Sequence, residues 1–269
     1  MIVACLKWVS HPGEPNDERF AGMSPADQSA LEFALVQAAA CGEGVTAVTV
    51  GPPAADKVLR DALACGAQRA IRIDAPAALS SSDVADAIAV AVPSPRWVWC
   101  GDYSLDRGTG SVPAFLAATL GAEQALGIIS VTLDRGGGAG DAGSIGATRR
   151  LDGGRRELLA VAAPAVLSVE GATAHLRRAG LAALRSAAAA PIEVVQPQAP
   201  RHAETAVVRP YRPRARVLSA PAGDHPLDRL RALTDAGAAV AARGETVTLD
   251  PPAAAQRILV ALREWGYLA

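Results

Sequence analysis

The chain has few cysteines, and their spacing excludes the simplest cysteine-based classes of protein. Among its 269 residues are only Cys5, Cys41, Cys65 and Cys100, which stand far apart and form no C-x-x-C pair. No histidine ligand set accompanies them. We therefore expect neither a metal site nor a disulfide framework, and we predict four buried free thiols in a reducing compartment.

The sequence also lacks any stretch of the ~18 uncharged apolar residues that a membrane span needs. Its first residues form a strand-like apolar segment at once, without the charged and then apolar layout of a signal peptide. A formal net charge of −1 gives no general attraction to nucleic acid or anionic lipid. We predict a cytoplasmic protein with neither membrane insertion nor nucleic-acid binding.

Catalytic motifs are missing as well. The sequence contains no recognisable Ser/His/Asp set, no Cys/His pair and no spacing typical of metal ligands. We therefore assign no catalytic residue and no metal ligand, and we do not expect the chain to be an enzyme by itself.

What the chain does contain is a regular alternation of strand and helix patterns, in a sequence that is 50% apolar. Strand is followed by helix four times within the first 120 residues. Parallel strands joined by helices in this way build a sheet that is covered on both faces. The strands are expected at residues 2–6, 45–50, 70–73 and 97–100, and the helices between Ser24 and Gly42 and at 54–65, 81–92 and 114–120.

After residue 127 the pattern changes. From residue 196, prolines and arginines recur without periodicity, which is typical of a linker, and two modest helices follow. We predict a three-layer α/β/α fold at residues 1–195, with a mostly parallel, Rossmann-like sheet of the adenine-nucleotide-binding type, and a C-terminal linker and arm at 196–269. The later strands are expected at 128–133, 165–169 and 192–195, with an antiparallel hairpin of 147–151 and 155–161.

One segment stands out, the stretch from Gly101 to Pro113 between a predicted strand and a predicted helix. It reads Gly-Asp-Tyr-Ser-Leu-Asp-Arg-Gly-Thr-Gly-Ser-Val-Pro. Its glycines let backbone N–H groups approach an anion, and the helix N-terminus adds a partial positive charge. Parallel sheets bind ligands at this carboxyl edge. The segment indicates a phosphate site, and an ordinary loop between strand and helix is the alternative.

With these elements in order, the chain resembles the beta subunit of electron transfer flavoproteins, the ETF beta/FixA family, from Ile2 to about Val195. The resemblance rests on the first strand, the helix start after Met23, a Val-Gly-Pro-Pro and an Ala-Leu-Ala-Cys-Gly-Ala-Gln-Arg-Ala segment, and the loop beginning at Gly101. The terminal Leu-Arg-Glu-Trp-Gly-Tyr-Leu is similar to an actinobacterial branch associated with mycofactocin-dependent dehydrogenases.

This resemblance implies a heterodimer in which a larger alpha subunit holds most of the FAD, while the beta chain binds a structural AMP. It also implies electron transfer from flavin- or mycofactocin-dependent dehydrogenases to a downstream quinone-linked acceptor. By position, the resemblance assigns cofactor binding to Cys5, Ser24, Pro25, Ala26, Asp27, Val50, Gly101, Asp102, Tyr103, Ser104, Leu105, Asp106, Arg107, Gly108, Thr109, Gly110, Ser111 and Val112.

Residues 174–190 correspond to the segment by which family members grip their partner dehydrogenases. Leu181 falls on the family's anchoring leucine, flanked by Arg177, Arg178 and Arg185. An exposed leucine of this kind enters an apolar pocket while the charges orient the approach. The alternative is a plain amphipathic surface helix.

Several residues depart from the family pattern. Ser24 stands where an asparagine is usual, and Gly108 where an acidic residue is common, so we expect the ligand to be held more by backbone N–H groups than by side chains. The loop after Val9 is short, with Phe20 as its aromatic residue, and its contact with flavin stays open.

Two alternatives remain, and a third class is excluded because its motif is missing. Bifurcating and Fix-type members, which the chain also resembles, place a second FAD where AMP would sit. A nucleotide-binding stress-type module would have the fold without the partner segment. An adenylating enzyme would need a Ser-Gly-Gly-x-Asp-Ser-like loop after the first strand, and Lys-Trp-Val-Ser-His stands there instead.

Overall fold

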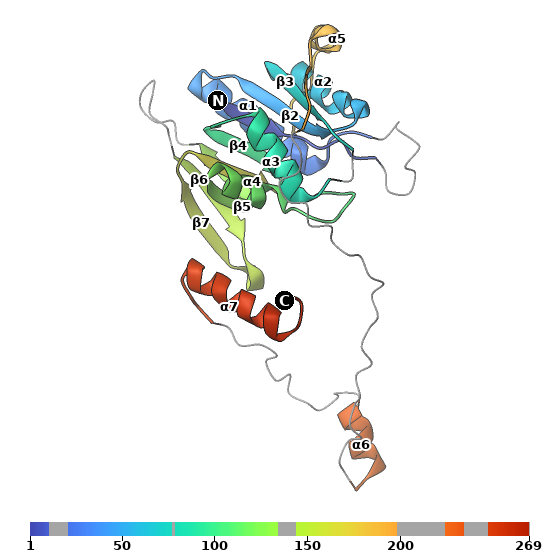
Figure 1. Cartoon of the computed structure of the whole chain (residues 1–269), viewed down its shortest axis with the longest axis vertical. Helices are drawn as coiled ribbons and strands as arrows, with labels where there is room; N and C mark the ends of the chain where they lie inside the picture. Colours follow the sequence, from blue (N-terminus) through green and yellow to red (C-terminus); the bar gives the residue numbers. More distant parts are fainter. Residues whose placement is uncertain (11–20, 77–78, 134–143, 198–223, 234–246, 269) are drawn as a thin grey trace. The chain divides into compact units, whose positions relative to one another are not determined.

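The structure is a computed structural model that describes residues 1–10, 21–76, 79–133, 144–197, 224–233 and 247–268. The chain forms two compact units, residues 1–205 and 206–269 (Figure 1). The first contains one nine-stranded sheet and its helices. The described part of the second contains helices α6 (Pro226–Leu233) and α7 (Pro251–Glu264). The linker predicted after residue 195 lies mostly outside the described residues.

The sheet is mostly parallel. Its strands are β1 (Ile2–Cys5), β2 (Val45–Gly51), β3 (Arg69–Asp74), β4 (Trp97–Gly101), β5 (Glu123–Leu133), β6 (Ile145–Arg150), β7 (Arg156–Val161), β8 (Ala165–Val169) and β9 (Glu193–Val195). They lie in the order β7-β6-β5-β8-β4-β1-β2-β3-β9, and the pairings β5–β6 and β6–β7 are antiparallel while the others are parallel. The predicted hairpin is therefore present.

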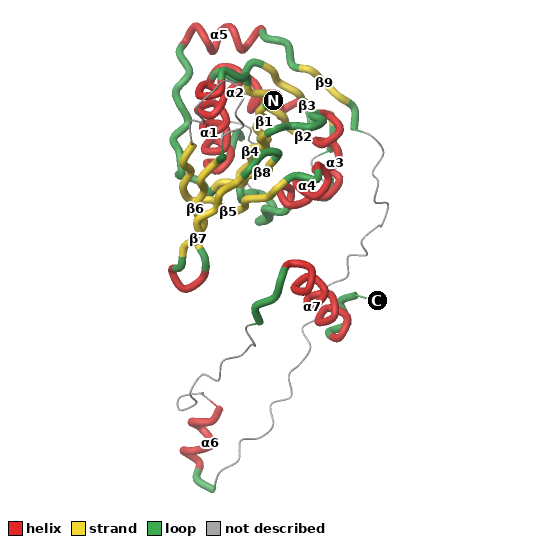
Figure 2. The backbone as a smooth tube through the Cα atoms, turned by 90° about the vertical axis from the view of Figure 1, so that its left-hand side faces the viewer, coloured by secondary structure: helices red, strands yellow, loops and turns green. Residues whose placement is uncertain are grey.

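Helices cover both faces of this sheet. They are α1 (Pro25–Cys41), α2 (Asp56–Cys65), α3 (Ser81–Ala91), α4 (Val112–Leu120) and α5 (Leu181–Ala189), with short 3-10 turns η2 (Pro53–Ala55) and η3 (Asp152–Gly154). Helices α1 and α2 lie on one face, and α3 and α4 on the other (Figure 2). Each face has its own apolar cluster, one containing Leu31 and Leu59 and the other Ile88 and Leu116. The predicted three-layer α/β/α fold is confirmed.

Strand β1 is the point where the chain reverses the direction in which it builds the sheet. Strands β2 and β3 are added on one side of β1, whereas β4 and β8 lie on the other. Right-handed connections running in opposite directions place their helices on opposite faces. The loops that follow β1 and β4 therefore diverge, and such a divergence opens a crevice at the carboxyl edge of the sheet.

Local sequence signals set several boundaries as predicted. The Ser24 hydroxyl caps α1 by accepting a hydrogen bond from Asp27 N at 3.0 Å, and Gly42 ends the helix in the left-handed conformation with φ 67°. Gly66 ends α2 with φ 118°. Strand β5 begins five residues before the predicted 128–133, because its residues 123–125 pair with β8 before the remainder pairs with β6.

A buried tryptophan organises the core beneath α1. The Trp99 ring stacks on Phe33 with 5.4 Å between ring centroids, and its Nε1 donates a hydrogen bond to Gln37 Oε1 at 2.8 Å. A buried N–H without a partner costs about 1–3 kcal/mol. Gln37, which is itself buried, supplies that partner and so allows an indole at the centre of the sheet.

The prediction of four buried thiols is wrong for two of them. Cys5 and Cys100 are buried free thiols, but Cys41 is exposed and Cys65 is half-buried. The physical reason is position, because Cys41 and Cys65 are the last residues of α1 and α2, where each helix reaches solvent.

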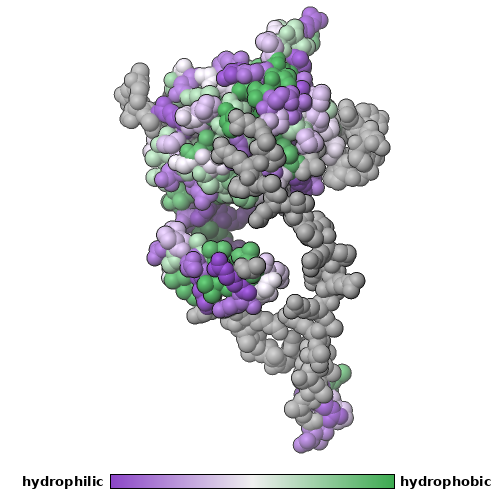
Figure 3. Space-filling view, viewed as in Figure 1, coloured by the Kyte–Doolittle hydropathy of each residue, from purple (hydrophilic) through white to green (hydrophobic). Residues whose placement is uncertain are grey.

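In the second unit, helix α7 is amphipathic. Asp250 caps it by accepting a hydrogen bond from Ala253 N at 3.0 Å. Ile258 on this helix and Trp265 at its C-terminal cap are exposed, and hydrophobic and hydrophilic residues lie side by side on its surface (Figure 3). In the described ranges of the chain, no helix combines the length and the apolar character that a membrane crossing requires.

Candidate functional site

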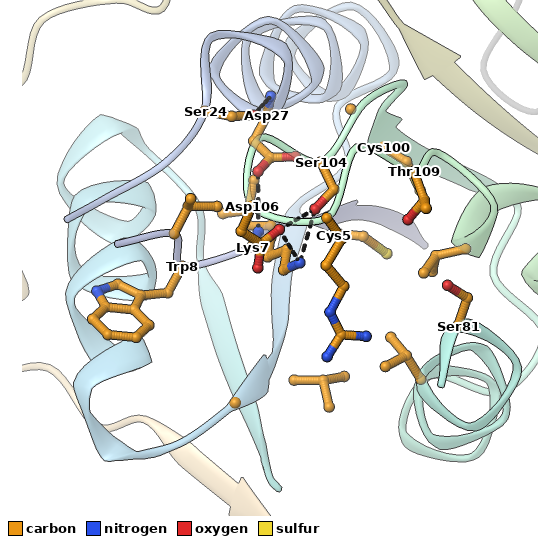
Figure 4. Close-up of a pocket in the computed structure, with 18 of the residues that line it drawn as sticks. Cys5, Lys7, Trp8, Ser24, Asp27, Ser81, Cys100, Ser104, Asp106 and Thr109 are labelled. Carbon is orange, nitrogen blue, oxygen red and sulfur yellow. Dashed lines mark hydrogen bonds and ion pairs between the residues drawn. The ribbon is translucent and has the colours of Figure 1, made fainter. Parts of the chain in front are cut away.

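A cavity of about 190 Å³ lies at the carboxyl ends of β1, β2 and β4, where the crevice is expected (Figure 4). Helix α3 borders it through Ser81, Val84 and Ile88, and the loop between β4 and α4 borders it from another side. The cavity brings together, from the predicted set, Cys5, Ser24, Asp27, Val50, Gly101, Tyr103, Ser104, Asp106, Arg107, Thr109, Gly110 and Val112.

The remaining predicted residues lie beside the cavity lining without belonging to it. Ala26 is buried and Pro25 is exposed at the start of α1, where both pack close to Gly171. Leu105 is 50% exposed at the tip of the β4–α4 loop. The other residues of this group are Asp102, Gly108 and Ser111.

The β4–α4 loop is held in shape by its own backbone. Ser104 N donates to Thr109 O at 2.9 Å, and Gly108 N donates to Ser104 O at 2.8 Å. Gly108 has φ +65°, which is the left-handed conformation that favours glycine. The Arg107 guanidinium donates to Leu79 O at 2.6 Å, so the loop is also tied to the segment before α3.

Gly110 is required for a structural reason in addition to the one that the sequence suggests. The sequence predicts that its small size lets a ligand approach the backbone. A Cβ atom at this position would lie 1.8 Å from the carbonyl oxygen of Asp102, across the loop. The loop itself therefore excludes any side chain at Gly110, whether or not a ligand is bound.

Asp27, in the first turn of α1, connects this helix to the chain just after β1 and to the end of β4. Its position suggests a capping box, but its Oδ2 accepts a hydrogen bond from Lys7 N at 3.2 Å, and the backbone of Gly101 also hydrogen-bonds to its carboxylate. Burial raises the pKa of Asp27 to about 6, although the hydrogen bonds from Lys7 and Gly101 lower it. Gly101 must be glycine, because a Cβ there would lie 2.6 Å from Asp27 Oδ1.

Lys7 is a cavity residue that the sequence reasoning missed. Its ammonium donates to Ser104 Oγ at 2.8 Å and pairs with Asp106 Oδ1 at 2.6 Å, which joins the end of β1 to the β4–α4 loop. Burial alone would raise the pKa of Asp106, but the hydrogen bonds from Lys7 and Ser104 outweigh it and lower that pKa. One signal was available: Lys7 and Trp8 directly follow the first strand, and both line the cavity.

The helix starts that border the cavity differ in how their N–H groups are satisfied. The start of α2, beside Ala55, has no side-chain cap but carries the acidic Asp56 in its first turn. Ser24 caps α1, and Ser80 caps α3 by accepting from Asp83 N at 3.1 Å. The first turn of α4 has no side-chain cap, since the hydroxyl of Ser111 makes no such bond. The uncapped N-terminus of α4, which carries no acidic residue in its first turn, is therefore the best-suited end of the cavity for an anion.

Part of the cavity lining is apolar. Val50 at the end of β2 and Val84 and Ile88 of α3 line it, together with the thiols of Cys5 and Cys100. Sequence reasoning identified the strand ends but missed Val84 and Ile88 of α3. Only the packing of α3 against the sheet turns these two side chains toward the cavity. An apolar lining in the same cavity as an uncapped helix start is the kind of surface that suits a nucleoside phosphate.

The predicted partner-binding segment is fixed to the body of the first unit. Arg177 pairs with Glu32 of α1 at 2.8 Å, and Arg60 of α2 donates to Ala187 O of α5 at 2.7 Å. Leu181 begins α5 and is 67% exposed. Arg178 and Arg185 are exposed as well. The structure thus presents Leu181 on a supported helix, while Arg177 is engaged within the chain.

Among the described residues, no group of three or more His, Cys, Asp and Glu side chains is arranged to hold a metal ion. The fold and the cavity define an α/β protein with a cavity at the switch point of a mostly parallel sheet.

Comparisons with known proteins give the family. The electron transfer flavoprotein domain matches residues 17–200. Protein FixA of Azorhizobium caulinodans is 31% identical over 218 residues, which are 74% of this chain and 75% of that protein. The electron transfer flavoprotein subunit beta of Clostridium acetobutylicum is 31% identical over 147 residues, 49% of this chain and 57% of that protein. The mitochondrial electron transfer flavoprotein subunit beta of Arabidopsis thaliana is 30% identical over 174 residues, which are 64% of this chain and 67% of that protein. The chain belongs to the ETF beta/FixA family.

Proposed function

We propose that the chain is the beta subunit of a heterodimeric electron transfer flavoprotein and that its cavity holds one AMP as a structural nucleotide. A larger alpha subunit holds most of the FAD, which supplies the redox chemistry when bound. The heterodimer carries electrons from dehydrogenases to a downstream quinone-linked acceptor. The named relatives support the subunit type, and the cavity supports the nucleotide.

The observation that carries the AMP proposal is the combination of an apolar slot with the uncapped start of α4 in one cavity. The slot of Val50, Val84 and Ile88 suits an adenine ring, and the N–H groups at the start of α4 suit a phosphate. Thr109 adds a hydroxyl on the same loop. The start of α1 is a poorer phosphate site, because the carboxylate of Asp27 lies there.

The experiment is to purify the chain with its alpha partner, release the bound nucleotides by denaturation and count them. We expect one FAD and one AMP per heterodimer, and no tightly held flavin on the isolated chain. Thr109→Val should lower AMP affinity by about tenfold, the loss of one hydrogen bond to a charged group. Thr119→Val is the matched control, since the Thr119 hydroxyl bonds to Asp86 away from the cavity. Full AMP occupancy in Thr109→Val at limiting AMP would contradict the placement of the phosphate.

A second candidate is a Fix-type subunit with a second FAD in place of AMP. The relative covering the largest share of this chain among those compared above is named FixA, which favours this reading. The nucleotide count separates the two candidates, because two FAD and no AMP per heterodimer would establish the second. A nucleotide-binding stress-type module would purify without any alpha subunit.

The partner dehydrogenase is proposed to dock at Leu181, with Arg178 and Arg185 orienting its approach. Whether that partner depends on flavin or on mycofactocin stays a prediction. It is tested by mixing the reduced dehydrogenase of each kind with the purified heterodimer and following flavin absorbance.

A further inference from the structure

Two cysteines meet on neighbouring strands at the floor of the cavity. Cys5 is the last residue of β1, and in the parallel pairing of β1 with β4 its partner in register is Cys100. Side chains of residues paired in this way point to the same face of a sheet. Both cysteines belong to the apolar cluster on the α3 and α4 face, and both are free. The fold has therefore placed two thiols side by side that are 95 positions apart in the sequence.

These thiols also face the ligand cavity. Cys5 is 9% exposed and Cys100 is 4% exposed, and both line the cavity, as Figure 4 shows with Ser104 and Thr109 close by. Their strand positions pair directly in the register of β1 with β4. The other two cysteines lie elsewhere: Cys41 is exposed at the end of α1, and the Cys65 thiol donates to Arg177 O at 3.4 Å.

We propose that Cys5 and Cys100 form an oxidisable dithiol in the floor of the cavity, which hydrogen peroxide converts to a disulfide and which a bound nucleotide shields. The shielding rests on the proposed function, whereas the formation of the disulfide does not. Nothing in the electron-carrier role requires this pair of thiols.

Strand geometry permits the bond. Neighbouring strands lie about 4.7–4.9 Å apart. Disulfides join residues whose Cα atoms are usually about 4.4–6.8 Å apart. Register partners on β1 and β4 therefore meet the Cα requirement without movement of the sheet.

The reaction proceeds in two balanced steps. The Cys5 sulfur attacks one oxygen of hydrogen peroxide, the O–O bond breaks, and a sulfenic acid and one water form. The Cys100 sulfur then attacks the Cys5 sulfur, the S–O bond breaks, and a disulfide and a second water form. Cys5 is the first nucleophile because it is the more exposed of the two. The hydrogen bond to Cys5 and burial hold the pKa of Cys100 well above its ordinary value, so Cys100 keeps its proton until the second step.

Oxidation changes the cavity in which the nucleotide binds. A disulfide replaces two separate thiols that line the slot and links the carboxyl ends of β1 and β4. We expect the oxidised protein to bind AMP less tightly by about tenfold, and AMP to slow the oxidation. With AMP at ten times its dissociation constant, only about one-tenth of the protein is unliganded, so the rate should fall about tenfold.

The test uses the full chain with Cys41→Ser and Cys65→Ser, which leaves only the proposed pair. Treatment with hydrogen peroxide should remove both titratable thiols, lower the mass by two hydrogen atoms and leave the protein monomeric on a non-reducing gel. A reductant should restore both thiols. The control adds Cys5→Ser, which leaves Cys100 alone and should give no internal disulfide. Peptide mapping of the oxidised wild-type chain gives an independent readout if the double variant does not fold.

Each outcome decides one part of the proposal. The proposed dithiol would be refuted if thiols were lost no faster in the two-cysteine variant than in the control that keeps only Cys100. A disulfide containing Cys41 or Cys65 in the oxidised wild-type chain would refute it as well. If AMP binding is measured to be saturated and the oxidation rate is still unchanged, the dithiol does not lie in the cavity that binds AMP. Failure of AMP to bind at all would refute the proposed function instead, and the disulfide formed without nucleotide would still establish the dithiol.

Discussion

The carboxylate of Glu32 on α1 and the guanidinium of Arg177 form a paired hydrogen-bonded contact, with Arg177 Nη2 2.8 Å and Nε 3.0 Å from its oxygens. The backbone N–H of Arg177 donates to the same carboxylate at 3.0 Å. Burial of Glu32 would raise its pKa, but these bonds from Arg177 outweigh it and lower the pKa. Ser29 holds the same segment through Ala174. The contact fixes the segment that leads into α5 and so positions Leu181.

Replacing Arg177 with alanine should therefore loosen this segment without changing the cavity. Because the pair is partly exposed, we expect a loss of about 1 kcal/mol in the free energy of unfolding. Hydrogen exchange of residues 174–180 should accelerate, and electron transfer from the dehydrogenase should slow. Arg178→Ala is the matched control and should alter only the salt dependence of association. Equal exchange rates in the two variants would refute the positioning role of Arg177.

Replacing Leu181 with alanine should weaken docking of the dehydrogenase. An exposed leucine that becomes buried in a partner contributes roughly 1.5–3 kcal/mol, so electron transfer at limiting concentration should slow by about tenfold or more. Thermal stability and nucleotide content should stay unchanged, because Leu181 is 67% exposed. Leu184→Ala, on the same helix and 45% exposed, is the control. Early melting of the Leu181 variant would show that this leucine is structural.

Replacing Asp27 with asparagine should remove a pH dependence of stability. The folded pKa of about 6 lies above the ordinary value of 3.8, so between these values the folded state binds more protons than the unfolded state. Its contribution to the free energy of unfolding is therefore full below about pH 4 and falls by about 3 kcal/mol as the pH rises through 6. Lys7 and Cys100 are the titratable groups beside it.

Urea unfolding of the wild type and the Asp27→Asn variant from pH 4 to 7 measures this effect as a difference. The wild type should lose stability relative to the variant as the pH rises. Asp106→Asn is the control, because the pKa of Asp106 is lowered from its ordinary value of 3.8 and its contribution is lost only as the pH falls below about 4, so its stability difference from the wild type should not change between pH 4 and 7. A stability difference between wild type and Asp27→Asn that does not change with pH would contradict the raised pKa.

Replacing Gly110 with alanine should disrupt the β4–α4 loop even without a ligand. The new Cβ would lie 1.8 Å from Asp102 O, and relief of such overpacking costs about 1–3 kcal/mol. Denaturant unfolding of the nucleotide-free chain measures this cost. Gly180→Ala is the control, since nothing lies within 4 Å of a Cβ there. An unchanged stability of the Gly110 variant would mean that the loop rearranges freely.

The sequence by itself determined the features that depend on near neighbours. The cap of α1 at Ser24 and its end at Gly42 follow from hydrogen bonds and backbone conformations within a few residues, so residue type alone predicts them. The order of strands and helices follows from apolar periodicity, and with it the parallel sheet and the place of the loop after β4. The family motifs depend on the same local order.

Only the tertiary structure decided which distant groups meet. Asp27 is placed to cap its own helix, yet its carboxylate binds the backbone of Lys7, because β1 ends beside the start of α1. The pairing of Lys7 with Asp106 and the register of Cys5 with Cys100 depend on β4 lying next to β1, a result of the reversal at the switch point. No pattern of nearby residues encodes these contacts, because each joins segments that become neighbours only when the whole sheet has formed.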